Sequence, residues 1–396
     1  MTIRAAFQPL QPAGLWGPAA LEPFLVAACE EGASDILMAP DSPFWVRIHG
    51  RWEQASQVPV GRAEIALLVD FLANRNTAAT EVVSGKDLDF SAEIKVGRGN
   101  IRRFRGNATG CRAGGVVGIS LVLRTIPGVP PELSTMDVEP ALQDSLVPTN
   151  GLVIITGTTG SGKTTFLAAL LASIRQQHPW NMITYEHPIE FSLTEVANPQ
   201  GPCAQTEIPF HIKEFGKAGR NANRRAPDVV LVGESRDPET FKGVMELADS
   251  GPRVYTTAHT RSVEETPSRI VAAFPTEEQP FRGGLLFAAL RLIIHQRLLP
   301  RIGGGRVPVR SFLAIDQYVR DQVYGIPIAQ TVPILRKLVA ERGQTLVTSA
   351  ERAYSQGLVA EEEVIKIRRE FEVAKTSTIV SPALDTPPIT TLAEEA

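Results

Sequence analysis

The strongest constraint on the fold is a glycine-rich segment, GTTGSGKT, that runs from Gly157 to Thr164. It fits the pattern G-x-x-x-x-G-K-[ST], in which a turn joins a buried strand to a helix. An apolar run from Leu152 to Thr156 precedes it, and residues 164–176 follow with a helical pattern. Further strand-like runs alternate with helical segments after it, which predicts an α/β fold with a mostly parallel sheet.

The chemistry of this segment suits the phosphates of a nucleotide. Glycines let successive backbone N–H groups point inward, and the positive end of the following helix also attracts anions. We expect Lys163 to reach the β- and γ-phosphates and Thr164 to present its hydroxyl to Mg²⁺. The segment therefore predicts ATP or GTP binding, and a glycine-rich turn without a ligand is the alternative. The predicted nucleotide-binding residues are Gly157, Thr158, Thr159, Gly160, Ser161, Gly162, Lys163, Thr164 and Thr165.

Two later segments place carboxylates where strands are predicted to end. The apolar run 227–233 leads to Glu234, which is the arrangement of a Walker B element. Such a strand end lies beside the γ-phosphate and Mg²⁺ in a sheet that carries this loop. Glu234 is therefore the leading candidate for polarising the attacking water and for contacting the metal. The segment ITYEHPIEF adds Glu186 and Glu190, for which an exposed surface position is the alternative.

Composition and pattern predict two domains, because 396 residues with 43% hydrophobic side chains can bury two cores. Proline and glycine residues mark the first 20 residues and the boundary between the domains, and residues from about 375 onward combine Ser, Thr and Pro with scattered acids. The predicted ranges are 1–20 for a flexible arm, 21–123 for a small α+β domain, 124–135 for a linker, 136–374 for the nucleotide-binding domain with C-terminal helices, and 375–396 for a disordered tail.

Charge and cysteine usage narrow the classes of partner. A net charge of −3 gives no general field for a polyanion, so we predict no direct binding of nucleic acid. Three widely separated cysteines fit a reducing compartment better than a disulfide framework. No run approaches the roughly 20 apolar residues that cross a bilayer, and residues 285–294 are predicted to form a core helix. We expect a cytoplasmic protein in which His178 and His295 lie in helices and have structural or surface roles.

Four segments in order resemble one family, the secretion-superfamily P-loop ATPases, which are PilT- and GspE-like. Its Walker A loop, Asp box, Walker B element and His box are similar to GTTGSGKTT, ITYEHPIEF, VVLVGESRD and VYTTAHTRSVEE. The segments at 33–35 and 103–107 extend the resemblance into the N-terminal domain. Residues 220–227 and 343–354 look most like the DotB and TraJ ATPases of type IVB secretion and conjugative plasmid transfer.

The resemblance implies a RecA-like ATPase domain preceded by a small α+β, PAS-like domain. It also implies a homohexameric, Mg²⁺-dependent ATPase motor, attached through partners to the cytoplasmic face of a membrane complex for secretion, conjugation or pilus work. The system expected first is type IV secretion or conjugative transfer. A pilus retraction or assembly ATPase and a slow ATP-binding regulatory subunit are the alternatives.

Residue roles follow from the same resemblance. Glu190 and Glu234 match the catalytic acids, and Glu186 lies nearby as support. His259 matches the histidine that senses the γ-phosphate. The remaining matches are arginines, namely Arg105 and Arg124, which would reach the nucleotide from the N-terminal domain, and Arg220 and Arg224, which lie near the subunit boundary. The sequence departs from the family at His187, where an acid is common, and at Pro252, where a second histidine is lost.

Overall fold

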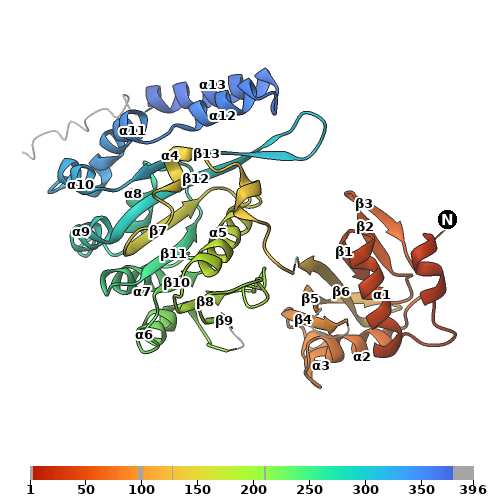
Figure 1. The fold of residues 1–396 in the computed structure, drawn as a ribbon. Coiled ribbons are helices and arrows are strands. Elements are labelled where there is room, and N and C mark those ends of the chain that lie inside the picture. Colours follow the sequence, from red (N-terminus) through yellow and green to blue (C-terminus); the bar gives the residue numbers. More distant parts are fainter. Residues whose placement is uncertain (1–2, 97–100, 127, 209–210, 378–396) are drawn as a thin grey trace, which may run out of the picture. The chain divides into compact units, whose positions relative to one another are not determined.

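The computed structural model describes residues 3–96, 101–126, 128–208 and 211–377 (Figure 1). Contacts divide the chain into two units, residues 1–135 with 164–233 and residues 136–163 with 234–396. This division interleaves the chain, whereas the domain limits predicted from the sequence are contiguous and stay a prediction.

The N-terminal part of the first unit is an α+β fold built on a six-stranded antiparallel sheet. The strands have the order β3-β2-β1-β6-β5-β4, and each neighbouring pair is antiparallel. The elements are α1 (Pro18–Glu30), β1 (Ala33–Met38), β2 (Trp45–Ile48), β3 (Arg51–Gln54), α2 (Arg62–Leu72), α3 (Ala78–Val83), β4 (Leu88–Lys95), β5 (Ile101–Ala113) and β6 (Val116–Ile126). The predicted α+β class is confirmed for this region, and β6 continues three residues beyond its predicted end at Leu123.

The residues His49 and Gly50 form the turn between β2 and β3. Both residues have positive φ, 49° and 80° respectively. Two-residue hairpin turns need this backbone because it matches the twist of the flanking strands, and glycine adopts it without steric cost.

The first 20 residues are not a flexible arm within the described part of the chain, so that expectation is wrong. A short 3₁₀ helix spans Ala5–Leu10, and the side chains of Phe7 and Trp16 are fully buried. Trp16 stacks on Phe44 with ring centroids 4.2 Å apart, and Phe7 packs on Phe24 at 5.1 Å. Isolated aromatic side chains bury a large area without any periodic pattern, which is why the sequence pattern missed them.

A second sheet has seven strands in the order β13-β12-β7-β11-β10-β8-β9. Its strands are β7 (Gly151–Thr156), β8 (Met182–Glu186), β9 (Cys203–Glu207), β10 (Val229–Val232), β11 (Arg253–Ala258), β12 (Leu290–Pro300) and β13 (Arg306–Ala314). The pairs β7 with β11, β7 with β12, β8 with β9 and β8 with β10 are parallel, whereas β12 and β13 are antiparallel. All residues of β7, β8 and β10 are buried, as expected for strands covered on both faces. The predicted mostly parallel α/β sheet is confirmed.

Helices precede, connect and follow these strands. They are α4 (Pro140–Gln143), α5 (Lys163–Gln177), α6 (Ala218–Asn223), α7 (Pro238–Asp249), α8 (Thr266–Val271), α9 (Gln279–Ala289), α10 (Gln317–Val323), α11 (Thr331–Arg342), α12 (Leu346–Ser355) and α13 (Glu361–Ser377). The start of α7 is well defined, since the Asp237 carboxylate accepts a hydrogen bond from the Thr240 N–H at 2.9 Å and Pro238 occupies the first helical position.

One predicted helix, residues 285–294, is wrong in its second half. Helix α9 ends at Ala289, and β12 begins at the next residue, Leu290. A short apolar run fits a buried helix or a buried strand equally well, and the β-branched pair Ile293 and Ile294 favours the strand. His295 therefore lies in a strand rather than in a helix.

The C-terminal helices α12 and α13 lie together beside β13 (Figure 1). Buried side chains from β12, β13, α12 and α13 form one apolar cluster, made of Leu299, Val307, Val309, Ala350, Ala353, Val359, Val364 and Ile367. The predicted C-terminal helices are thus present. Of the predicted tail, residues 375–377 belong to α13, and residues 378–396 lie outside the described residues. Among the described helices, none has the length and apolar character to cross a membrane.

Candidate functional site

The glycine-rich loop and the His-box segment leave the sheet at the same edge. Strands β7 and β11 are parallel neighbours, and Thr156 pairs with Ala258. Gly157 and His259 are the next residues of the two strands. Because parallel strands end on one edge, the pairing brings the loop and His259 to the edge where α/β sheets bind ligands.

The loop backbone needs glycine at its first position. Gly157 has φ of 142°, and a Cβ there would lie 2.4 Å from the Gln296 carbonyl oxygen. Gly160 and Gly162 also have positive φ, 78° and 81°. Another side chain at Gly157 would collide with β12, so the loop conformation depends on the glycine that the motif specifies.

Lys163 turns back toward the loop that precedes it. Its side chain is buried, with Nζ donating to the carbonyl oxygens of Gly157 at 2.8 Å and Thr158 at 2.9 Å. Thr164 is exposed, and Thr165 is half-buried. The ammonium group thus lies inside the curve of the loop, where a phosphate oxygen can replace the carbonyls as its acceptor.

Strand β10 ends at Val232, and Glu234 follows two residues later, where an arginine and a histidine hold its side chain. Its Oε1 lies 2.6 Å from His259 Nε2 and 2.5 Å from Arg236 Nε. Partial burial acts to raise the pKa of the Glu234 carboxyl, but the hydrogen bonds from Arg236 and His259 together outweigh it and hold this pKa below its ordinary value. The structure therefore brings together Glu234 and His259, with the Glu234 carboxylate ionised at neutral pH.

The neighbouring residue Ser235 fixes this segment to β11. Its N–H donates to the Thr257 carbonyl at 3.0 Å, and its hydroxyl lies 2.8 Å from the Thr256 hydroxyl. Both contacts are buried, so they restrict where the Glu234 side chain begins.

Glu186 ends β8 and is buried, so the alternative of an exposed surface position is wrong for this residue. Its Oε1 accepts hydrogen bonds from Thr184 Oγ1 at 2.5 Å and Gln205 Nε2 at 3.0 Å. Burial raises the pKa of the Glu186 carboxyl to about 7 against these two hydrogen bonds, and the carboxylates of Glu190 and Glu207 add to the rise. Glu190 is half-buried. Glu186 is thus suited to holding a proton near neutral pH.

Replacing Glu186 with Gln is expected to stabilise the protein at pH 8 and to change little at pH 4. The folded carboxyl titrates near pH 7 and the ordinary one near 4.5, so the folded state keeps a proton that the unfolded state has lost between these values. Stability therefore falls as the pH rises through that window, by up to about 3 kcal/mol at 1.36 kcal/mol per pKa unit. The amide oxygen of Gln can still accept from Thr184 and Gln205.

Chemical unfolding of both proteins between pH 4 and pH 8 measures this difference. The exposed Glu341, which is replaced with Gln as the control, should give no pH-dependent difference. If the free energies of unfolding of the wild-type protein and the Glu186→Gln variant differ by the same amount at every pH in this range, the pKa of Glu186 is not raised.

Two predicted arginines lie directly opposite each other in the N-terminal sheet. Arg105 of β5 pairs with Arg124 of β6, and both side chains are exposed. Arg124 Nε lies 3.0 Å from Asp35 Oδ1, and the Asp35 side chain is only 8% exposed. Asp35 therefore positions Arg124, a contact that the sequence analysis missed although the Ala-Ser-Asp segment at 33–35 was its signal. Arg220, in α6, and Arg224, just after it, are also exposed.

His295 has a different place from the one predicted. It is buried in β12, and its Nδ1 lies 3.1 Å from the Thr156 hydroxyl, one residue before the loop. Burial lowers the pKa of the His295 imidazole to about 4, and the charges of Arg297 and Lys163 add to the effect. His295 is therefore neutral at physiological pH.

The side chains present fit Mg²⁺ as the metal of a nucleotide complex. Mg²⁺ prefers oxygen ligands and is bound by few protein groups together with phosphates. The Thr164 hydroxyl and the Glu234 carboxylate supply such oxygens. In the part of the chain that the structure describes, no group of three or more His, Cys, Asp and Glu side chains could hold a metal alone.

Comparisons with known proteins agree with this geometry. Residues 20–304 match the family described as "Type II/IV secretion system protein". A twitching motility protein of Neisseria gonorrhoeae is 32% identical over 80% of this chain and 82% of its own length. The type IV pilus retraction ATPase PilT of Pseudomonas aeruginosa is 31% identical over 88% of this chain and 98% of its own length.

Solved structures show the same fold. The crystal structure of the Legionella pneumophila ATPase DotB superposes with a TM-score of 0.83 and 34% identity, covering 91% of this chain and 98% of DotB. A crystal structure of the pilus retraction motor PilT with bound ADP gives a TM-score of 0.74 and 29% identity, covering 88% of this chain and 96% of PilT.

Proposed function

Because the chain belongs to the family of type II/IV secretion system proteins, we propose that it is the hexameric, Mg²⁺-dependent ATPase motor of a type IV secretion or conjugative transfer system. Membership in this family, close to DotB and PilT, makes the chain an ATP hydrolase of the kind that drives secretion and pilus machines. The observation that carries the enzymatic part is the position of the Glu234–His259 pair, beside the end of β11 and hence beside the glycine-rich loop. The match to DotB supports the choice of a type IV secretion motor.

In the proposed site, the loop from Gly157 to Thr165 surrounds the phosphates of ATP. Lys163 exchanges the carbonyls of its own loop for β- and γ-phosphate oxygens. Thr164 and Glu234 would hold Mg²⁺, which neutralises phosphate charge when it is bound. These contacts favour the charge distribution of the transition state over that of free ATP.

Glu234 then has the chemical role of orienting a water molecule and accepting its proton. The carboxylate is ionised, which a proton acceptor requires. His259 and Arg236 both contact the Oε1 atom of Glu234. A change at the γ-phosphate that moves His259 therefore also changes the hydrogen bonding of Glu234. We assign Glu190 a second catalytic acid role, with the buried Glu186 supporting it.

The proposed hexamer would complete each site with positive charge from elsewhere in the ring. Arg105 and Arg124 lie on the N-terminal sheet, and Arg220 and Arg224 lie at α6, all with exposed side chains. An arginine supplied by another domain or subunit stabilises transition-state charge and links closure of the site to hydrolysis. The ring would dock through partners on the cytoplasmic face of the membrane complex.

A pilus retraction motor is the second candidate function. The relatives that favour it are the twitching motility protein and PilT, at 32% and 31% identity over most of the chain. Both candidate functions require the same ATPase site and the same hexameric ring. They differ in the membrane machine that the motor drives.

The ring predicts that the total rate of ATP hydrolysis rises more steeply than linearly with protein concentration, so that specific activity increases with concentration. Replacing Arg220 or Arg224 with Ala should cut turnover by roughly tenfold or more while leaving ATP affinity nearly intact, because these groups act on the transition state. Mixing either variant with a Glu234→Gln subunit should restore part of the activity, since the two defects then fall in different composite sites. Phosphate release over a concentration series, with analytical ultracentrifugation in ATP, measures both effects.

Arg269 on α8 provides the matched control, because its side chain is exposed and pairs only loosely with Glu265 at 3.9 Å. Its replacement with Ala should leave turnover unchanged. A monomer with full activity at every concentration would overturn the ring and leave the ATPase assignment intact.

A further inference from the structure

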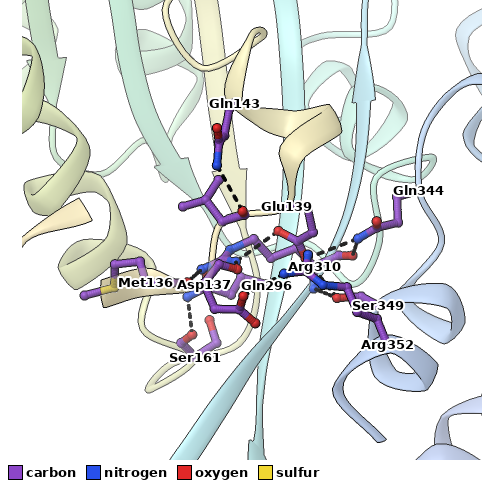
Figure 2. A network of polar contacts seen from close by, with 11 residues as sticks. Met136, Asp137, Glu139, Gln143, Ser161, Gln296, Arg310, Gln344, Ser349 and Arg352 are labelled. Atoms are coloured by element: carbon purple, nitrogen blue, oxygen red, sulfur yellow. Dashed lines mark hydrogen bonds and ion pairs between the residues drawn. The ribbon is translucent and has the colours of Figure 1, made fainter. Parts of the chain in front are cut away.

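A buried chain of polar contacts runs from the glycine-rich loop to the C-terminal helices (Figure 2). Gln296 Nε2 donates to the Ser161 carbonyl in the loop at 2.8 Å. Gln296 Oε1 accepts from Arg310 Nε, also at 2.8 Å. Arg310 Nη1 then contacts the Glu139 carboxylate at 3.0 Å. No motif contains these residues, because their partners lie far away in the sequence.

Arg310 anchors this series of polar contacts. Its side chain is fully buried, and burial lowers the pKa of its guanidinium against the opposing effect of Glu139. Besides Glu139, the guanidinium donates to the carbonyl oxygens of Asp137 at 3.0 Å and Met136 at 2.9 Å. A buried charge is tolerated only when its donors are satisfied in this way, so Arg310 has little freedom to move.

Helix α12 and the residues before it complete the support. Ser349 donates to Glu139 Oε1 at 2.9 Å, and Gln344 Nε2 donates to the same atom at 3.2 Å. The Arg310 N–H in turn donates to the Ser349 hydroxyl at 3.0 Å. Arg310 and Glu139 are therefore held by segments that are far from the loop in the sequence.

Gln296 is the link that touches the loop. Its side chain is 1% exposed, and the amide has one contact on each side, one to the loop and one to Arg310. The backbone carbonyl oxygen of Gln296 is the atom that a Cβ built on Gly157 would approach most closely. The Nε2 atom of Gln296 is the atom that a Cβ built on Gly162 would approach most closely. Gln296 thus borders the loop at both of its invariant motif glycines and at Ser161 between them.

We propose that Gln296 is a positioning residue for the nucleotide phosphates, which sets the shape of the glycine-rich loop through the Ser161 carbonyl and is itself held by the Arg310–Glu139 pair. The inference rests on the proposed nucleotide site and concerns binding rather than the chemical step. Gln296 touches no reacting atom. Its loss should therefore weaken the binding of ATP and ADP alike and leave turnover at saturating ATP nearly unchanged.

Two substitutions at this position separate the contacts. Gln296→Met keeps the length of the side chain and removes both hydrogen bonds. Gln296→Glu keeps an oxygen for Arg310 and replaces the donor to the Ser161 carbonyl with a second carboxyl oxygen. We expect both variants to raise the KM for ATP and the Kd for ADP by about tenfold, the effect of one lost buried hydrogen bond, with kcat within about twofold of the wild type.

The control is Thr331→Val, another isosteric change that removes a buried hydrogen bond, here from the Thr331 hydroxyl to the Ile328 carbonyl at 2.7 Å. Fluorescent ADP titration, steady-state phosphate release and thermal unfolding are measured for all three variants. Weaker nucleotide binding in both Gln296 variants but not in the control, with each titration made well below the melting temperature of the variant, supports the inference. Unchanged ADP affinity in Gln296→Glu, or an equal loss in Thr331→Val, overturns it.

The test does not depend on the motor assignment. If the wild-type protein binds ADP but releases no phosphate, the proposed function fails, and the ADP titration still decides the role of Gln296.

Discussion

Lys163→Ala is expected to lower the affinity for ATP by roughly 100-fold or more and to abolish measurable hydrolysis at physiological ATP concentrations. The substitution removes a buried ammonium group whose contacts with charged phosphate oxygens are each worth more than an ordinary hydrogen bond. It also removes the two hydrogen bonds that Nζ makes to the carbonyls of Gly157 and Thr158. Titration with a fluorescent ATP analogue and a phosphate-release assay measure the two consequences separately.

The control for this variant is Lys337→Ala on α11, which removes a positive charge whose side chain is 74% exposed. Nucleotide binding should not change there, because an exposed and solvent-screened charge contributes little. A Lys163→Ala protein with unchanged affinity and turnover would show that the glycine-rich loop is not the phosphate site.

Glu234→Gln is expected to separate binding from hydrolysis. The variant should keep ATP bound with an affinity close to that of the wild type, and its turnover should fall by about 100-fold or more, which is the usual contribution of a positioned general base. The amide is nearly isosteric with the carboxylate and retains an oxygen that can accept from His259 or Arg236, but it cannot accept a proton from water. Single-turnover hydrolysis and ATP titration test the two halves of this expectation.

The exposed partner of Lys337, Glu341, supplies the matched acid, and Glu341→Gln should leave turnover unchanged. Equal losses of affinity and turnover in Glu234→Gln would count against its role as a base.

Introduced into the organism that carries the gene, the Glu234→Gln variant also distinguishes the two candidate machines. Loss of substrate or plasmid transfer with normal surface motility would support secretion or conjugation, and the reverse would support pilus retraction.

Local sequence patterns were sufficient to predict the framework of the ATPase site. The predicted strand 152–156 corresponds to Gly151–Thr156, and the predicted helix 164–176 corresponds to Lys163–Gln177, so no end differs by more than one residue. The glycine-rich motif works in this way because the backbone conformation, the close approach at Gly157 and the lysine all lie within eight consecutive residues.

The features that the sequence analysis missed depend on contacts between distant residues. Arg310 and Glu139 are 171 positions apart, and Gln296 reaches a loop residue 135 positions earlier. A buried polar residue gives no sign, in its local sequence, of the distant partner that satisfies it. The first 20 residues were missed for a related reason, because Trp16 and Phe7 are buried by α1 and the loop before β2 rather than by a local repeat.

The place of β7 in its sheet also constrains how the protein reaches its native state. This strand, which leads directly into the glycine-rich loop, pairs with β11 on one side and β12 on the other. Both neighbours follow it by on the order of 100 residues, and parallel pairing over such a separation forms slowly because a long loop must first close. During synthesis, β7 therefore leaves the ribosome with both of its edges unpaired, and the edge that pairs with β12 stays open until β12 is complete at Pro300. The strand that carries the loop can therefore complete its pairing only after residue 300 has been synthesised, and we expect the glycine-rich loop to gain its full support from that point on.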